Sequence, residues 1–98
     1  MTAILFEDDE AYHAWLRANP KGFVLNVRKS PTPSYMVLHC AVCHSISIGQ
    51  RNGAFTENAY RKVCAGSISE LRTWARQHDS MNGEFSRHCQ TCSPMGRR

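Results

Sequence analysis

The sequence has no long hydrophobic run. No stretch of its 98 residues approaches the roughly 18–20 apolar residues that a membrane-spanning helix requires. The apolar run at residues 3–6 is too short for the core of a secretory signal peptide. Internal repeats and low-complexity segments are absent as well. These absences argue against membrane, secreted and repeat proteins, and the length leaves room for a single domain over residues 1–98.

Acidic residues are scarce after the start of the chain. Four of the eight form one run at residues 7–10, and from residue 11 onward twelve basic residues face only four acidic ones. Nine of the twelve basic residues are arginine, whose planar guanidinium suits phosphates and guanine edges. This balance favours a polyanionic partner, with nucleic acid as the first candidate. The alternative is a basic surface that serves only solubility.

The sequence also lacks a recognisable catalytic set. The serines occur in no nucleophile-elbow context, and the carboxylates are crowded near the N-terminus or scattered. His39 and His44 do not form a convincing His-Asn-His nuclease hairpin. We therefore expect no enzymatic activity in this chain, and a nuclease activity would belong to a fused or partner domain.

The pattern of apolar and turn residues predicts an α+β fold, with two helices and a small antiparallel sheet of three or four strands. Asp8 or Asp9 can cap a first helix, which ends before Asn19. Ser67 and Glu70 form a capping box that opens a second helix, expected to reach about residue 78. The expected strands are residues 23–28, 35–40, 45–49 and 59–64.

Two clusters of cysteine and histidine lie far apart in the chain. One is His-Cys-Ala-Val-Cys-His at residues 39–44, and the other is His-Cys-Gln-Thr-Cys at residues 88–92. A Cys-x-x-Cys turn suits tetrahedral zinc, and two such half-sites complete a closed structural site that staples a small core. The odd number of cysteines, five, favours a reducing cytoplasmic compartment over disulfides. His44 and His88 each flank a cysteine and could be ligands or bystanders.

The identity of the four zinc ligands depends on the first cluster. Strand alternation places Cys40 on the face of Met36 and Leu38, which indicates the core, and His39 on the opposite face. His39 with Cys43 is therefore the expected pair, and Cys40 with Cys43 is the alternative. Together with the C-terminal pair, the expected zinc ligands are His39, Cys43, Cys89 and Cys92.

Short motifs across nearly the whole chain resemble one small actinobacterial domain. They are Gly-Phe-Val-Leu-Asn at residues 22–26, Tyr-Met-Val-Leu-His at 35–39 with Cys43, residues 60–64, and Cys-Gln-Thr-Cys-Ser-Pro at 89–94. That domain occurs alone or ahead of HNH-type nuclease domains in modification-dependent restriction, and it includes proteins that bind 5-methylcytosine DNA.

This resemblance implies a zinc-binding module that reads modified duplex DNA and acts in the cytoplasm, at the nucleoid. It also implies that the His-x-x-x-Cys and the C-terminal Cys-x-x-Cys are the shared metal residues. Members of the domain family tend to have a basic residue where this chain has Cys40, which leaves the Cys40 alternative open. A fused or partner nuclease domain is a further implied partner.

The residues expected to contact DNA lie at strand ends, on loops and on the last strand. Basic and polar side chains around a rigid sheet can reach phosphates and base edges. Tyr35 and Phe55 are the aromatic residues best placed to hold a modified base. The alternatives are a zinc-stapled protein-interaction module with a basic face and a small metal-dependent nuclease. The expected DNA contacts are Arg28, Lys29, Ser30, Tyr35, Arg51, Asn52, Arg61 and Lys62.

Overall fold

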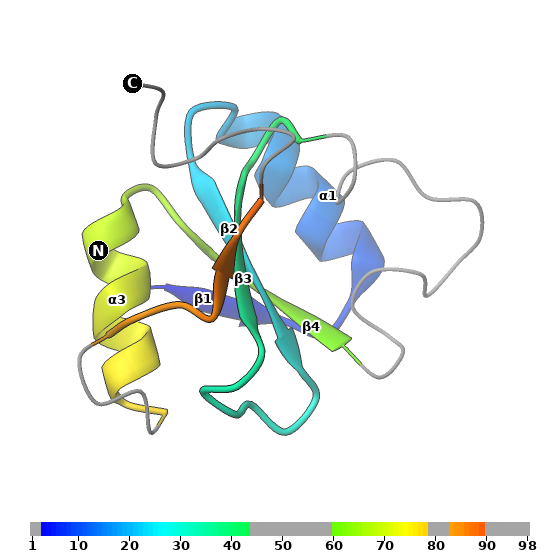
Figure 1. The fold of residues 1–98 in the computed structure, drawn as a ribbon. Coiled ribbons are helices and arrows are strands. Elements are labelled where there is room, and N and C mark those ends of the chain that lie inside the picture. The colour runs from blue at the N-terminus through cyan, green and yellow to red at the C-terminus, as the bar shows by residue number, and fades with distance from the viewer. Residues whose placement is uncertain (1–2, 44–59, 79–82, 90–98) are drawn as a thin grey trace.

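The computed structural model describes residues 3–43, 60–78 and 83–89 of the chain. These residues form an α+β domain in which two helices accompany a five-stranded sheet (Figure 1). Neither helix of this described part is long and apolar enough to cross a membrane. The elements, in chain order, are β1 (Ile4–Phe6), α1 (Asp9–Ala18), β2 (Phe23–Arg28), β3 (Met36–Cys40), β4 (Tyr60–Ala65), α3 (Ile68–Arg76) and β5 (Arg87–His88).

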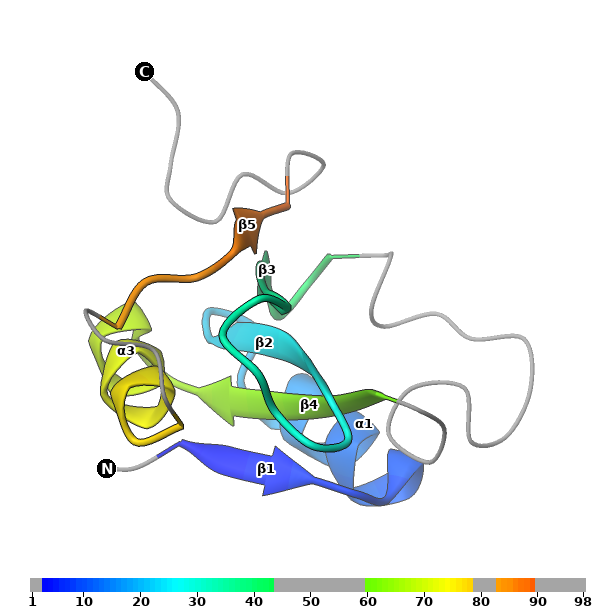
Figure 2. The same ribbon diagram turned by 60° about the horizontal axis from the view of Figure 1, so that its bottom comes forward.

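The sheet is larger than the predicted three- or four-stranded antiparallel one. Its strand order is β1-β4-β2-β3-β5, and Figure 2 shows the five strands side by side. The first four pair antiparallel, whereas β5 pairs with β3 in parallel, so the sheet is mixed. The edge strands β1 and β5 have three and two residues, too few for an alternating pattern to be visible in the sequence. The strand predicted at residues 45–49 lies outside the described residues.

Both predicted helices are confirmed, and local capping chemistry explains where each begins. At the start of α1 the Asp8 carboxylate accepts a hydrogen bond from the Ala11 N–H at 3.0 Å. At the start of α3 the Glu70 N–H donates to the Ser67 hydroxyl, and the Ser67 N–H donates to the Glu70 carboxylate. These caps satisfy N–H groups that have no partner inside the helix, so they fix the helix start. The second helix ends at Arg76, two residues before its predicted end.

The two helices pack on opposite faces of the sheet. Successive strand residues point to opposite faces, and the buried side chains divide accordingly into two clusters. Leu71, Trp74 and Ala75 of α3 cover one face, and Tyr12 and Leu16 of α1 cover the other. The sheet and its adjoining turn contribute Leu25, Val27, Met36, Leu38, Val63 and Ala65 to the α3 side, and Val24, Ala41, Cys43 and Cys64 to the α1 side.

Candidate metal centre

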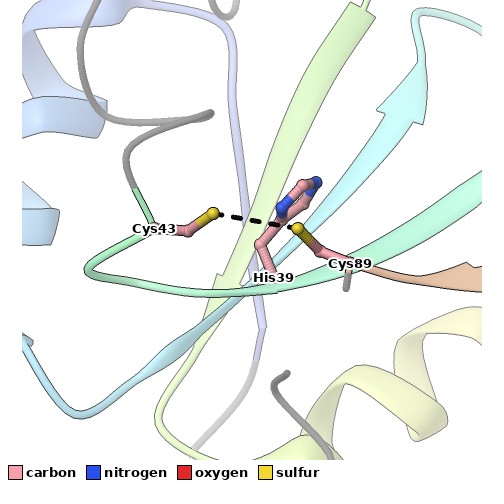
Figure 3. Close-up of side chains that lie close together, drawn as sticks. All are labelled: His39, Cys43 and Cys89. Atoms are coloured by element: carbon pink, nitrogen blue, oxygen red, sulfur yellow. Dashed lines mark hydrogen bonds between the residues drawn. The ribbon is translucent and has the colours of Figure 1, made fainter. Parts of the chain in front are cut away.

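Three of the four predicted metal ligands come together where β3 and β5 end. His39 lies on β3, Cys43 in the turn after it, and Cys89 directly after β5. One ligand atom from each lies within 4.8 Å of the others, so the three residues are close enough to hold a metal ion (Figure 3). The fourth predicted ligand, Cys92, and the possible ligand His44 lie outside the described residues.

The parallel pairing of β5 with β3 positions Cys89 at the candidate metal centre. Leu38 is the register partner of His88, and the Cys89 N–H donates to the Leu38 carbonyl at 2.8 Å. Cys89 is therefore fixed beside His39, the residue that follows Leu38 on β3. No local sequence pattern indicates this strand pairing, because the paired residues are 50 positions apart.

The turn after β3 holds Cys43 by its backbone. The Cys43 N–H donates to the Cys40 carbonyl at 3.0 Å and closes the turn. The Ala41 N–H donates to the Gly22 carbonyl at 3.0 Å, which ties the turn to the residue before β2. Ala41 and Cys43 are both buried in the cluster under α1. The sulfur of Cys43 is thus presented from a rigid backbone rather than from a free loop.

The spacing of the two sulfur atoms suits a shared metal ion. The Sγ atoms of Cys43 and Cys89 are 3.9 Å apart, a weak thiol contact drawn as a dashed line in Figure 3. A disulfide would bring the sulfurs to about 2.05 Å, so no disulfide joins the two cysteines. Two thiolates on one tetrahedral zinc, each at about 2.3 Å from the ion, would be ~3.8 Å apart. The observed distance therefore fits zinc coordination with little movement.

The imidazole of His39 is in the form that binds metals. Its side chain is 7% exposed, and its pKa is lowered to about 4, first by burial and then by the positive charge of Lys62. A metal needs the neutral imidazole, since a protonated ring has no free nitrogen lone pair. At neutral pH the ring is therefore available as a ligand without first losing a proton.

The other described cysteines and His88 stand apart from this group. Cys40 is partly buried and does not belong to the metal group within the described residues. Cys64 is fully buried in the α1-side core, as expected of a core residue, and burial raises the pKa of its thiol. His88 is exposed on β5, where its ring contacts the edge of Phe85 at 6.1 Å between centroids.

Seven of the eight residues predicted to contact DNA fall into three groups, and the eighth, Tyr35, is half-buried beside Arg28. Arg28, Lys29 and Ser30 are exposed at the end of β2, where the β2–β3 loop begins. Arg61 and Lys62 are instead 9% and 4% exposed, a placement that differs from the surface contacts expected of them. They lie on β4, which has β1 on one side and β2 on the other, so it is an interior strand. The third group, Arg51 and Asn52, lies outside the described residues, as does Phe55.

A connected set of side chains stands behind the exposed Arg28. Its guanidinium lies 5.0 Å from the ring centroid of Tyr35 and 5.7 Å from that of Tyr60. The Asn26 amide donates to the Tyr35 hydroxyl at 3.2 Å, and the Lys62 ammonium donates to the Asn26 amide oxygen at 2.8 Å. Burial lowers the pKa of Lys62 to about 8. We call these five residues the Arg28 cluster.

Asn26 and Tyr60 belong to this cluster although neither was predicted as a functional residue. Tyr60 is the register partner of Arg28, and Lys62 is the register partner of Asn26. Both pairings join β2 to β4, which are not consecutive strands in the sequence, so they can be recognised only once the strand order is known. The remaining signal was local, namely that Asn26 stands alone as a polar residue in the apolar run of β2.

Comparison of the chain with protein-family models, with curated proteins and with solved structures finds no match. Two features of the described residues bear on function: a His-Cys-Cys group that can hold a metal, and an exposed arginine held against two aromatic rings.

Proposed function

We propose that this chain is a zinc-stapled module that binds duplex DNA and reads a 5-methylcytosine-type modification. The observation that carries the binding part is the Arg28 cluster, in which an exposed guanidinium rests on Tyr35 and Tyr60. Lys29 and Ser30 extend the polar surface from there into the loop. The reading of a modified base is supported by the resemblance of the sequence motifs to a domain of modification-dependent restriction.

The proposed metal is zinc in a closed structural site. Nitrogen and sulfur ligands at this spacing favour zinc, and Cys92 follows Cys89 at the Cys-x-x-Cys interval of a second half-site. A site closed by four protein ligands leaves no position for a reactive water. The zinc would therefore stabilise the fold, by joining β3 to the segment after β5, and would not catalyse a reaction.

The Arg28 cluster has the properties of a phosphate contact. Aromatic faces attract a guanidinium and limit the conformations that its long side chain samples, so less entropy is lost when it binds. The N–H groups of the guanidinium still face solvent, because Arg28 is exposed. Contacts to phosphate position a protein on the duplex, whereas groove contacts give the sequence or modification preference. Arg28 would thus supply affinity and orientation.

The proposed biological role is that of a targeting domain. Affinity for modified duplex DNA would place a fused or partner nuclease at methylated sites. The chain's local excess of basic residues after residue 10 suits such a polyanionic partner. The compartment that fits this role is the cytoplasm, at the nucleoid.

The test is fluorescence anisotropy of the zinc-loaded protein with three matched duplexes: unmodified, hemimethylated and fully methylated. Over a salt series, the logarithm of the affinity should fall linearly with the logarithm of the salt concentration. Tighter binding to a methylated duplex supports the proposal. Equal affinity for the three duplexes contradicts the modified-base part, and no binding at low salt contradicts the whole proposal in favour of a protein-interaction module.

A further inference from the structure

A pocket of about 600 Å³ opens at the edge of the sheet where β5 pairs with β3. Its described walls are Val37, His39, Arg87, His88 and Cys89. Two of these residues, His39 and Cys89, belong to the candidate metal centre, so a bound metal would make this wall of the pocket rigid. The other three are not needed to hold a metal.

The pocket lies in line with the Arg28 cluster. Val37 and His39 are alternate residues of β3, so their side chains stand on the same face of the sheet. Asn26, the register partner of Val37 on β2, shares this face, and its amide donates to the hydroxyl of Tyr35, the residue before β3. Tyr35 belongs to the Arg28 cluster, Val37 lines the pocket, and His39 belongs to both the pocket and the metal group. From Tyr35 to His39 the chain covers at most roughly 13 Å, at ~3.3 Å per extended residue. One strand of B-DNA carries a phosphate about every 3.4 Å along its axis, so a DNA strand held at Arg28 would pass the pocket.

The chemistry of the walls suits a planar ring that carries a negative charge. Val37 supplies an apolar surface, and its register partner Arg87 supplies an exposed cation. No acidic residue is among the described walls, so an anionic ligand meets no repulsion from them. The volume falls in the range of small-ligand sites, roughly 300–1,000 Å³, which holds a nucleotide.

We propose that this pocket receives a single nucleotide extruded from the duplex. This inference rests on the proposed function, since it names the place where the DNA is read. Arg87 binds the phosphate of the extruded nucleotide, and Val37 contacts the face of its base. A protein that reads a base outside the stack must unpair it first, and the free-energy cost of this step is smallest for a mismatched base.

The experiment compares two duplexes that differ only in the pairing of one central methylated cytosine. In one duplex the cytosine faces guanine, and in the other it faces a base with which it cannot pair. The zinc-loaded wild-type protein should bind the mismatched duplex roughly tenfold more tightly or better. The reason is that the mismatched cytosine is not paired, so less free energy is needed to extrude it. Equal affinity for the paired and mismatched duplexes would overturn the proposal.

Two variants test whether the tighter binding to the mismatched duplex depends on the pocket. Arg87→Ala removes an exposed side chain, and Val37→Phe fills the pocket; both should lose the preference for the mismatched duplex. Arg17→Ala, on the last turn of α1, removes the same charge from an exposed residue that is not among the described walls of the pocket, and it should keep the preference. Zinc content and thermal unfolding show whether Val37→Phe has folded. If Val37→Phe does not fold, Arg87→Ala alone tests whether the pocket receives the nucleotide.

The outcomes separate this inference from the proposed function. If Arg87→Ala keeps the full preference for the mismatched duplex, the pocket is not the receiving site, although DNA binding stands. If the wild-type protein binds neither duplex at low salt, both the inference and the proposed function are wrong.

Discussion

The Sγ atoms of Cys43 and Cys89 lie 3.9 Å apart although 46 positions separate the two residues in the chain. A metal held between them would join the turn after β3 to the segment after β5. The domain is small, and a chain of this length buries only roughly 60–65% of the surface that its unfolded form exposes. Metal binding that occurs only in the folded state adds its free energy to folding, so a metal held by this pair would stabilise the domain.

Replacing Cys89 with serine should remove the metal and unfold the domain. Structural zinc contributes on the order of 10 kcal/mol in small zinc domains, comparable with the whole stability of a typical protein. Zinc stoichiometry and circular dichroism of Cys89→Ser measure both effects. A variant that retains one equivalent of zinc and the wild-type melting temperature would place the site elsewhere.

The two models of the first half-site are separated by a pair of alanine variants. His39→Ala should lose the metal, because His39 belongs to the group of close ligand atoms. Cys40→Ala should keep it, because Cys40 stands apart from that group within the described residues. Metal content after gel filtration is the measurement. The reverse result, with the metal lost only from Cys40→Ala, would favour the Cys40–Cys43 pair.

The buried Lys62 should make stability rise with pH in a defined window. Its pKa is lowered from 10.5 to about 8 in the folded protein, mainly by burial. Between these values the unfolded chain binds more protons at this residue, so the free energy of unfolding increases as the pH rises. The gain is on the order of 3 kcal/mol, since each pKa unit corresponds to about 1.4 kcal/mol.

Urea unfolding of zinc-loaded wild-type protein and Lys62→Met at pH 8 and pH 10.5 measures this gain as the difference between the two proteins, because the buried Cys64 thiol, whose pKa is raised, acts in the opposite direction in both. Lys62→Met should lack it, while Lys29→Met, which changes an exposed lysine of the loop, should behave as the wild type. An equal gain in wild-type protein and Lys62→Met would show that other groups cause the pH dependence.

The aromatic support of Arg28 should contribute to DNA affinity through the ring of Tyr35 rather than through its hydroxyl. Tyr35→Ala removes a cation–π contact of about 0.5–1 kcal/mol and should weaken binding a few-fold. Tyr35→Phe loses the hydrogen bond from Asn26 but keeps the ring under Arg28, so its affinity should stay near the wild-type value. Anisotropy with one methylated duplex compares them, and equal losses in both variants would assign the effect to the hydroxyl.

The elements that local chemistry determines could be predicted from the sequence. The cap at Asp8 and the capping box of Ser67 and Glu70 place both helices, because their hydrogen bonds join residues three positions apart. The residues of β2 are those predicted, since alternation and turn signals mark them. The choice of His39 over Cys40 in the metal group agrees with the alternation of side chains along β3, but the core position expected of Cys40 was wrong, because Cys40 is only partly buried whereas His39 is 7% exposed.

The features that the sequence did not predict depend on pairing between distant segments. The edge strands β1 and β5 exist because β4 and β3 offer them hydrogen bonds, not because of their own patterns. Arg61 and Lys62 were predicted to lie on the surface, but their strand, β4, is an interior strand between β1 and β2. Asn26 joins the Arg28 cluster through its register with Lys62, which requires the strand order.

The most direct test of the proposed binding surface is the salt dependence of DNA affinity for Arg28→Ala beside Arg17→Ala. Both variants remove one exposed arginine, so they have the same net charge, but only Arg28 rests on the two tyrosine rings. With a methylated duplex and zinc-loaded protein, Arg28→Ala should weaken binding roughly tenfold and lower the salt slope by about one. Arg17→Ala should stay within about twofold of the wild type. Equal affinities and slopes for the two variants would contradict the account, because the DNA would then bind away from the Arg28 cluster.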